Sequence, residues 1–412
     1  MNVLFVVRNQ LQAELYREII ASPGFMAHGA TARWLWLIDE SSVAVNGHKG
    51  SSMAHQNTHV PLVGQLESLS DWRHRLSVLG GLRTRIAREC RLHRPAAIVL
   101  ANDRPFAEQT VIRMARHYGI PTVLIQDGWI PSWQDLNWPD RFRRSAAHLL
   151  GLVGIPGVGA GRPGLGSTDY CGVMGRWWLT RVRSRSGSPG TVRVVGQPLF
   201  DATMRSSRQR HAASGEPTRP YRILFLATDF AVGIGDDAAH RAQMRDIGTL
   251  HSVLHEELGD EFVLTIRPHP MEGQGYFSAL QKGFAHLTID ANSSLDAAIS
   301  GQDLVVSNLS STCLAVIETG VPSLVFSHHL SRGRYGRLLQ LQPGRRAVDR
   351  EAVRECIRDL GDADKRRDWI DGNRARARDY LYVDPERTAA DLVVEFLTSI
   401  IARSSSPTLI TI

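Results

Sequence analysis

The first half of the chain alternates short apolar runs with amphipathic stretches. NVLFVV (2–7) precedes a helical period around 13–20, AAIVLAND (96–103) precedes a helical run over 106–117, and IPTVLIQDGW (120–129) adds a third apolar run. Uninterrupted Val, Ile and Leu runs of this length are typical of parallel strands that are buried on both faces. We therefore predict a parallel sheet with helices between its strands.

The same pattern starts again after residue 220. A helix is predicted near 238–257, a charged helical region over 349–380 and an amphipathic helix over 386–402. The apolar runs of this half, each predicted to be a strand, are 221–228, 262–266, 286–290, 303–308 and 322–327.

The polar and basic segment TMRSSRQRHAASGEPTRP (203–220) has the composition of a linker. Because 412 residues exceed one ordinary core, two domains are expected. The predicted boundaries are 1–205 for an acceptor-binding domain and 219–385 for a donor-binding domain. A final helix and tail, 386–412, is expected to pack back toward the first domain.

Composition narrows the classes of ligand. The chain is 43% hydrophobic and 22% charged, as in globular proteins, and its formal net charge is +7. A modest positive charge favours phosphorylated ligands, acidic polymers or an anionic membrane surface. Nucleic acid is disfavoured, because basic residues such as those of 181–193 lack regularly interleaved aromatic side chains.

The cysteines and the apolar segments bear on the compartment. MNVLFVV is read as a first strand and not as a signal peptide, because it is apolar only up to Arg8. The uncharged stretch 145–161 is too broken by Gly and Pro to span a bilayer, and a loop or a contact with a membrane interface is expected there. No CxxC pair exists, which argues against a zinc site or a disulfide scaffold and suits a reducing cytosol. The cysteines are Cys90, Cys171, Cys313 and Cys356.

Two prolines hold a histidine at the end of one strand of the second domain. In FVLTIRPHPMEG (262–273), Pro268 and Pro270 restrict the backbone around His269. Ligands of open α/β sheets bind beyond the carboxyl ends of the strands, and an imidazole there can donate to a phosphate oxygen. The alternative is a histidine satisfied by a local carbonyl, with the prolines merely ending the strand.

A second strand end carries hydroxyl groups. The segment SNLSST (307–312) leads from a strand into a helix that opens with Ser310, Ser311 and Thr312. Backbone N–H groups, hydroxyl donors and the positive helix end together predict an anion site. Ordinary N-capping is the alternative. Farther along the helix, Glu318 could accept hydrogen bonds from ribose hydroxyls.

These motifs follow each other in a known order. Strand–R-x-H-P (267–270), then strand–S-x-x-S-S (307–311) and a helix, then E-x-G-x-P (318–322) and a strand resembles the C-terminal domain of GT-B glycosyltransferases. The likeness is to bacterial capsule-type polymerases, meaning polysialyltransferases and CDP-glycerol glycerophosphotransferases. VRVVGQPLFDA (192–202) looks like the V-x-G-x-P-x-x-D segment that ends the N-terminal domain of many GT-B proteins. The resemblance extends over about 120–400, and the first hundred residues are generic.

The resemblance implies an α/β protein of GT-B type, with two Rossmann-like domains that face each other across a cleft. His269 would contact the donor phosphates, Ser310 and Ser311 would form the opposite wall, and Glu318 would hold the ribose. The donor site implied in this way comprises Arg267, His269, Pro270, Ser310, Ser311, Thr312 and Glu318.

The first domain is expected to supply the catalytic base. LIQDGW places Asp127 before Gly128 at a strand end, and it resembles the paired-acidic-plus-glycine motif of polysialyltransferases, with Gln126 at the first acidic position. A carboxylate in the cleft can remove the proton of the acceptor hydroxyl. Asp103, at the end of AIVLAND, is the rival base. Alternatively, Asp127 simply caps its turn.

No metal ion and no cofactor are expected. The chain lacks the D-x-D motif of the other major glycosyltransferase fold, and GDD (235–237) is read as solvated loop acids and not as a metal site. The phosphate charge would instead be neutralised by Arg267, His269, the helix end and hydroxyl groups.

The expected function is transfer of a sugar from a nucleotide-activated donor to a glycan or lipid-linked acceptor in bacterial surface polysaccharide synthesis. CMP- or CDP-linked donors come first and UDP-linked donors second. The expected place is the cytoplasm, with a peripheral contact at the inner membrane surface left open. One alternative is a UDP-N-acetylglucosamine 2-epimerase-like enzyme, although SNLSSTC lacks the closely spaced glycines of that class. The other is a non-catalytic nucleotide-sugar-binding protein.

Overall fold

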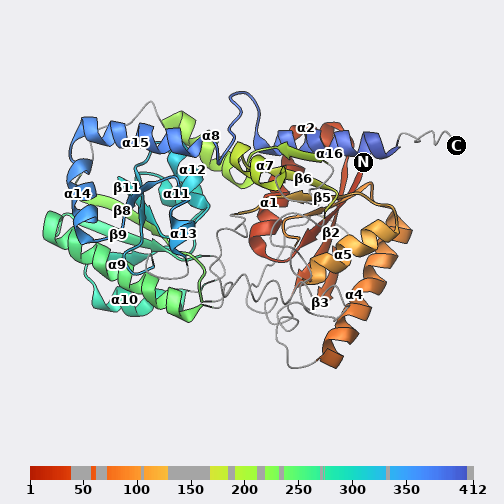
Figure 1. The fold of residues 1–412 in the computed structure, drawn as a ribbon, viewed down its shortest axis with the longest axis horizontal. Coiled ribbons are helices and arrows are strands. Elements are labelled where there is room, and N and C mark those ends of the chain that lie inside the picture. The colour runs from red at the N-terminus through yellow and green to blue at the C-terminus, as the bar shows by residue number, and fades with distance from the viewer. Residues whose placement is uncertain are drawn as a thin grey trace. The chain divides into compact units, whose positions relative to one another are not determined.

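The chain forms two compact units, each built on a parallel sheet with helices on both faces (Figure 1). Unit 1 comprises Met1–Leu199 and Leu381–Ile412, and unit 2 comprises Phe200–Tyr380. The structure is a computed structural model. It describes residues 1–38, 57–61, 72–103, 106–128, 168–183, 191–210, 219–231, 236–269, 272, 274–330 and 335–405.

Unit 1 contains seven described strands in the order β3-β2-β1-β4-β5-β6-β7. Its strands are β1 (Asn2–Val7), β2 (Thr31–Ile38), β3 (Asn57–Pro61), β4 (Ala97–Leu100), β5 (Thr122–Ile125), β6 (Tyr170–Val173) and β7 (Thr191–Val194). Its helices are α1 (Gln10–Ala21), α2 (Pro23–Ala27), α4 (Trp72–His93), α5 (Phe106–His117), α7 (Arg176–Arg183) and α16 (Ala389–Ser405), and the short η3 (Pro198–Phe200) lies at the boundary of the units.

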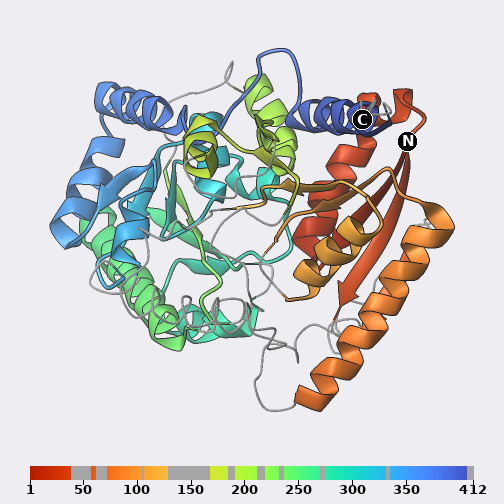
Figure 2. The same cartoon turned by 45° about the vertical axis from the view of Figure 1, so that its right-hand side comes forward.

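Helices cover both faces of this sheet. Figures 1 and 2 show α4 and α5 side by side on one face. On the other face α1 and α16 pack together against the sheet. The chain therefore returns to unit 1 at its end, because the apolar side of α16 completes a core that β1, β4 and β5 begin. Members of this core include Val3, Phe5, Tyr16, Val99, Val123, Val393 and Leu397.

Unit 2 contains six described strands in the order β10-β9-β8-β11-β12-β13. Its strands are β8 (Tyr221–Leu226), β9 (Phe262–Arg267), β10 (Leu287–Ile289), β11 (Leu304–Ser307), β12 (Ser323–Phe326) and β13 (Arg345–Ala347). Its helices are α8 (Asp201–Arg210), α9 (Asp237–Leu258), η5 (Gln274–Phe277), α10 (Ser278–Gly283), α11 (Leu295–Ile299), α12 (Thr312–Thr319), α13 (Gly336–Leu339), α14 (Arg350–Leu360) and α15 (Ala363–Ala377).

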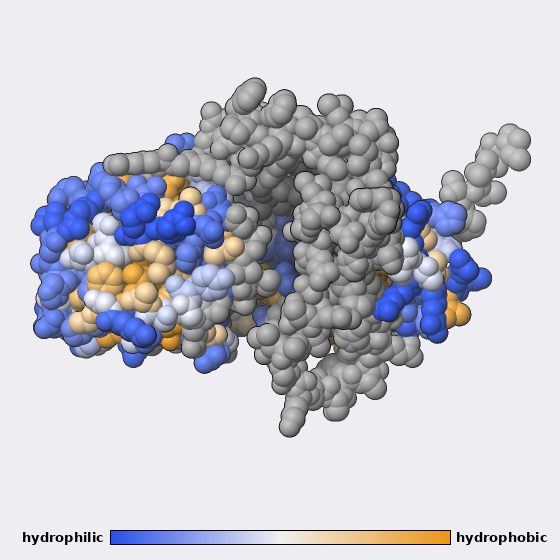
Figure 3. Space-filling view, turned by 90° about the horizontal axis from the view of Figure 1, so that it is seen from below, coloured by the Kyte–Doolittle hydropathy of each residue, from blue (hydrophilic) through white to orange (hydrophobic). Residues whose placement is uncertain are grey.

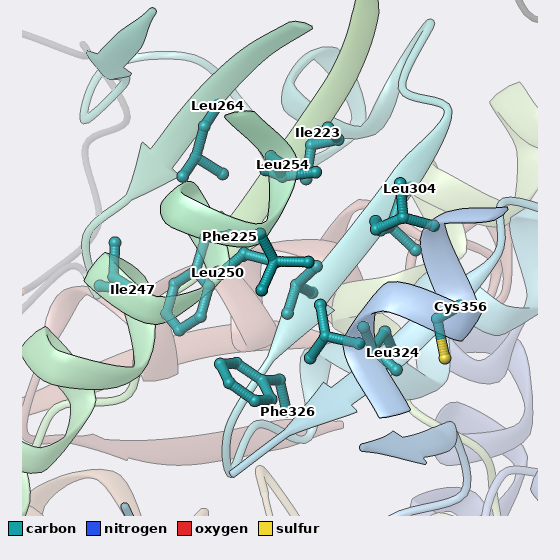
Figure 4. Close-up of a cluster of buried hydrophobic side chains, with 14 of the residues drawn as sticks. Ile223, Phe225, Ile247, Leu250, Leu254, Leu264, Leu304, Leu324, Phe326 and Cys356 are labelled. Atoms are coloured by element: carbon teal, nitrogen blue, oxygen red, sulfur yellow. The ribbon is translucent and has the colours of Figure 1, made fainter. Parts of the chain in front are cut away.

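Alternate strand residues divide this sheet into two packed faces. Figure 4 shows Ile247, Leu250 and Leu254 of α9 pointing toward the strands, and Cys356 of α14 belongs to the same cluster. The opposite face packs on α11 and α12 through Leu224 and other residues. Burial on both faces explains why most of these strands read as continuous apolar runs, and the exposed strand positions are Arg222, Thr288 and Arg346.

The apolar runs predicted most of these elements, and the segment 203–220 is the main exception. Its first part belongs to α8, which packs on α11 and α12 of unit 2. The linker prediction was therefore wrong for that part, because a polar, basic helix needs only one buried face. The predictions for 130–167 lie outside the described residues. No pattern indicated β2, β3 or α4.

The described surface mixes hydrophilic and hydrophobic residues (Figure 3). Some of its charges join elements: Arg354 and Arg358 of α14 bind Glu257 of α9, at 2.8 and 2.9 Å. Exposed ion pairs of this kind stabilise a fold only slightly, because solvent screens them. None of the described helices is long and apolar enough to cross a bilayer.

Gly196, in the V-x-G-x-P-x-x-D segment after β7, lets the first residue of α16 approach the backbone closely. Its φ is +75°, a conformation that side chains disfavour. A Cβ atom there would lie 2.9 Å from Ala389 Cβ and 2.9 Å from the carbonyl oxygen of Tyr382. The Tyr382 N–H donates to the Met174 carbonyl at 2.8 Å. The segment therefore joins the returning C-terminal chain to unit 1.

We expect Gly196→Ala to lower the midpoint of thermal unfolding strongly. Left-handed backbone alone costs an alanine about 1–2 kcal/mol, and contact with the Tyr382 carbonyl adds to that cost. Gly119→Ala is the matched control, because its φ is +67° but a Cβ atom there meets nothing within 4 Å. Equal losses in the two variants would contradict the close approach.

Candidate functional site

The sheet of unit 2 has a topological switch point between β8 and β11, where the order in which the chain adds strands reverses. From β8 the chain proceeds through β9 to β10 at one edge and then returns to β11, on the other side of β8. Ligands of parallel sheets bind at such a point, beyond the carboxyl ends of the strands. Here those ends carry Thr228 and Asp229 after β8, and 308–311 after β11.

A buried glutamine of α9 fixes this point. The Gln243 side chain accepts from the Thr228 N–H at 2.8 Å and donates to the Thr228 carbonyl at 3.1 Å. The Thr228 hydroxyl in turn donates to the Leu309 carbonyl at 2.8 Å. Gln243 therefore holds the backbone at the end of β8, and the Thr228 hydroxyl ties that end to the loop that leads into α12. Gln243 is completely buried, so water cannot replace these bonds.

A buried aspartate of α9 holds the next loops. The Asp246 carboxylate accepts from the His329 N–H after β12 at 2.8 Å, and its other oxygen lies 3.4 Å from Asn308 Nδ2 after β11. Burial raises the pKa of Asp246 to about 6, against the opposing effect of backbone donors. Asp246 and Gln243 together position the ends of β8, β11 and β12.

His269 lies beyond β9, half-buried. Its Nδ1 atom lies 3.7 Å from Asp229 Oδ2, and 32% of its side chain is exposed. Burial lowers the pKa of His269, and the Asp229 carboxylate opposes that shift. The imidazole is thus neutral near pH 7, with Nδ1 directed to a carboxylate.

The start of α12 provides the hydroxyl groups. Ser311 occupies the N-cap position, yet its side chain makes no capping hydrogen bond. The Ser310 hydroxyl accepts from the Thr312 N–H at 3.2 Å. Ordinary capping therefore accounts for Ser310 but not for Ser311, whose hydroxyl remains suited to an anion at the positive end of the helix.

The remaining expected donor residues lie in different surroundings. Arg267 Nη1 donates to the Ser293 carbonyl at 2.7 Å, so the guanidinium supports the loop after β10. Glu318 is half-buried in the last turn of α12, which Gly320 ends at φ +77°. Pro270 lies outside the described residues.

The two aspartates of GDD, expected in a loop, lie at the start of α9 instead, and Gly235 lies outside the described residues. Asp236 is the N-cap of that helix and accepts from the Ala239 N–H at 3.0 Å, and its second oxygen accepts from the Tyr335 hydroxyl at 3.0 Å. Asp237 lies in the first turn, where a negative charge is favourable. In the part of the chain that the structure describes, no three His, Cys, Asp or Glu residues are placed to hold a metal ion.

Sequence reasoning missed Glu272 and His240 beside His269. Glu272 Oε1 accepts from the Ala231 N–H at 3.4 Å and lies 3.5 Å from His240 Nδ1. Burial raises the pKa of Glu272 to about 7, and backbone donors oppose the shift. The only signal in the sequence was the position of Glu272 within PHPMEG, next to the prolines.

In unit 1 the two candidate bases follow the ends of two neighbouring strands, β4 and β5. Leu100 of β4 pairs with Leu124 of β5 in register, so Asp103 and Asp127 lie equally far beyond the sheet. Asp103 is 95% buried, with 5% of its surface exposed, and the Gln109 side chain donates to its carbonyl. Asp127 is half-buried and lies 3.4 Å from Gln12 Nε2 of α1.

Buried polar groups surround Asp127. Tyr16 of α1 is fully buried, and its hydroxyl has no hydrogen-bond partner among the described residues. Burial raises the pKa of Tyr16 well above its usual value, and the carboxylates of Asp127 and Glu108 raise it further. Arg8, after β1, lies 3.9 Å from Glu108. No sequence motif indicated that these side chains gather near the carboxyl ends of β1, β4 and β5.

The hydrogen bonds of Gln126 explain why a glutamine stands at the first acidic position of the paired-acidic motif. Its side chain accepts from the Met174 N–H at 3.0 Å and donates to the Gly128 carbonyl at 2.9 Å. An amide can do both at once, whereas an ionised carboxylate can only accept. Gln126 therefore shapes the turn that carries Asp127.

The cysteines take no part in either set of residues. All of them are buried and free. Burial raises the pKa of Cys90 and Cys356 to about 11 and that of Cys313 to about 12, so these thiols are protonated and inert at neutral pH.

The overall backbone is shared with solved structures. A UDP-GlcNAc 2-epimerase from Neisseria meningitidis bound to UDP-GlcNAc matches 97% of this chain and 100% of its own, with 12% identity and a TM-score of 0.58. The wall teichoic acid polymerase TagF soaked with CDPG matches 98% of this chain and 89% of its own, with 12% identity and a TM-score of 0.55. The glycotransferase of kitacinnamycin matches 97% and 98%, with 14% identity and a TM-score of 0.55.

The chain has the GT-B fold. No protein-family model and no curated protein sequence matches it. The fold predicted from the strand-end motifs is thus confirmed, while the similarity to transferases and epimerases alike does not separate those activities. Within a GT-B protein, the chemistry must be inferred from the residues at the strand ends.

We expect Gln243→Leu to lower the free energy of unfolding by about 2 kcal/mol or more. The substitution keeps the volume but leaves the buried N–H of Thr228 without its acceptor, which costs about 1–3 kcal/mol, and it frees the loop before α12. Urea denaturation measures the loss. Gln302→Leu, which removes one bond to the Ala298 carbonyl, should cost less. A Gln243→Leu protein as stable as the native protein would contradict the role of α9.

Proposed function

We propose that this GT-B protein is a glycosyltransferase that uses a nucleotide-activated sugar. The observation that carries the proposal is the set of hydrogen-bond donors at the switch point of unit 2: His269 after β9, and Ser310 and Ser311 at the start of α12. Imidazole, hydroxyls and a helix N-terminus suit a phosphate, the group shared by all nucleotide-sugar donors. Two of the GT-B structures similar to this chain are named for transfer or polymerisation.

The proposed donor residues divide by role. Ser310, Ser311 and Thr312 offer donors at the positive helix end, and His269 would donate from Nε2 when its imidazole is protonated, because the neutral ring with its proton on Nδ1 can only accept there. Glu318 would accept from the ribose hydroxyls, and Pro270 is proposed on the sequence motif alone, as a restraint on the residue that precedes it. Arg267 acts at longer range, because it is bonded to Ser293. CMP- or CDP-linked donors come first and UDP-linked donors second.

In unit 1, Asp127 is proposed as the base for the acceptor hydroxyl, and Asp103 as its rival. Partial exposure favours Asp127, since a base must reach the proton that it removes. The proposed acceptor is a glycan or a lipid-linked sugar of a bacterial surface polysaccharide, made in the cytoplasm or at the inner membrane surface. The proposed transfer needs no metal ion, because protein groups neutralise the phosphate charge.

A nucleotide-sugar panel tests the proposal. The full chain is incubated with CMP-, CDP- and UDP-linked sugars, with and without EDTA, and free nucleotide and sugar products are measured. Slow hydrolysis or transfer that persists in EDTA supports the proposal. Release of UDP with an epimerised sugar would establish the 2-epimerase alternative, and binding without turnover would establish a sensor.

Replacing His269 by Ala should reduce nucleotide affinity and turnover at least about tenfold, equivalent to about 1.4 kcal/mol. The fold should survive, because the side chain is partly exposed at a strand end. Calorimetric titration with CDP and UDP and a turnover assay measure both effects. His255→Ala, an exposed histidine of the same unit, is the control. Native activity in His269→Ala would refute the phosphate site.

Replacing Asp127 by Asn should reduce turnover about 10²–10⁴-fold, the range of a general base, with nucleotide affinity nearly unchanged. Asparagine keeps the size and an acceptor for Gln12 but removes the basic oxygen. Asp103→Asn is the matched comparison. If Asp127→Asn is active and Asp103→Asn is not, the base is Asp103. If Asp127→Asn loses nucleotide binding as severely as His269→Ala, Asp127 is structural.

A further inference from the structure

Two loops at the phosphate end of unit 2 are joined by paired carboxylates and histidines. The loop after β8 carries Asp229, and the loop after β9 carries His269 and Glu272. Asp229 contacts His269, and Glu272 contacts both the Ala231 N–H of the first loop and His240 of α9. The Glu272 N–H also donates to the His269 carbonyl at 2.8 Å. Besides the Asp229–His269 contact, Glu272 therefore joins the two loops, through its side chain to Ala231 and its N–H to the His269 carbonyl.

The Glu272 carboxyl is unusually placed for an ionised group. Its side chain has no exposed surface, and its Oε2 atom has no hydrogen-bond partner among the described residues. His240 Nδ1, at 3.5 Å from Oε1, lacks the alignment of a hydrogen bond. An unpartnered buried oxygen is costly when charged and much less so when it carries a proton.

The titratable groups around the Glu272 carboxyl do not offset the cost of burying its charged form. Asp229 faces it from the loop after β8 and raises its pKa, in addition to the larger effect of burial. His240 faces it from α9, and burial lowers the pKa of that imidazole below its usual value, while Asp237 and Asp229 oppose the shift and Arg241 supports it. His269, from the same loop, is neutral near pH 7. Near neutral pH, two carboxyls therefore lie among neutral imidazoles.

We propose that Glu272 is a positioning residue for His269, and that nucleotide phosphate binding is coupled to uptake of a proton from solvent by the Asp229–His269–Glu272 group. This inference rests on the proposed nucleotide site. A phosphate brought to His269 adds negative charge beside buried carboxyls, and like charges favour protonation. The proton either converts Glu272 to its neutral form or converts His269 to an imidazolium that donates to the phosphate.

The test measures proton uptake on the full chain. CDP and UDP are titrated calorimetrically at pH 7.5 in buffers of different ionisation enthalpy, and the slope of the observed enthalpy gives the number of protons taken up. The native protein should take up about half a proton or more. Glu272→Gln, which keeps the acceptor for Ala231, should take up less than half of the native amount. Asp260→Asn, which alters an exposed Asp–His pair with His286, should behave as the native protein.

Equal proton uptake by the native protein and Glu272→Gln would overturn the proposal. If neither CDP nor UDP binds the native protein, the proposed function fails, and a ligand-free measurement decides the role of Glu272.

The folded pKa of Glu272 is raised to about 7 from 4.5. Between pH 4.5 and about 7 the folded protein therefore binds more protons than the unfolded chain, and its stability falls as pH rises through this range. The thermal midpoint of Glu272→Gln, relative to the native protein, should rise between pH 5 and 8; a constant difference would reject a buried proton.

Discussion

The arrangement of unit 2 depends on two polar side chains that α9 buries against the ends of the strands. Gln243 bonds the backbone after β8, and Asp246 bonds the Asn308 side chain after β11 and the backbone after β12. Buried polar groups stabilise a fold only when they are paired, and then they allow one arrangement and penalise others. The apolar side of the same helix packs into the core, so α9 joins the core to the loops that carry the candidate site.

This constraint also limits the chemistry of the proposed donor site. The His269 side chain contacts the Asp229 carboxylate, the Glu272 carboxyl of the same loops lies next to His240, and Arg267 donates to Ser293. A phosphate would then be held mainly by oriented donors of α12 and of His269, with little fixed positive charge. Preorganised dipoles act on charge that develops in the transition state without binding the released nucleotide too tightly. That property suits a leaving group that must depart after each transfer.

Sequence patterns predicted the central strands well because β4, β5, β11 and β12 are buried at every position, so that each appears as an apolar run. The motifs around His269 and Ser310 also identified two strand ends, and the structure places both beside the switch point of the sheet. The supporting residues could not be predicted in this way. Gln243, Asp246 and Glu272 are polar residues inside helical or loop segments, where the sequence looks like an ordinary solvated surface. Their contacts appear only when distant strands are assembled.

Unit 1 follows the same topological rule and offers a reason to distinguish its two aspartates. Its switch point lies between β1 and β4, where Arg8 follows one strand and Asp103 the other. The Asp103 carbonyl accepts from the Gln109 side chain, and Asp103 is only 5% exposed, so its carboxylate has little access to an acceptor hydroxyl. Asp127 is one strand farther along and partly exposed, on a turn that Gln126 fixes. Access and a fixed turn are both needed by a general base, since proton transfer requires hydrogen-bond contact in a defined geometry. The structure thus favours Asp127 for a physical reason that is independent of the motif that first indicated it.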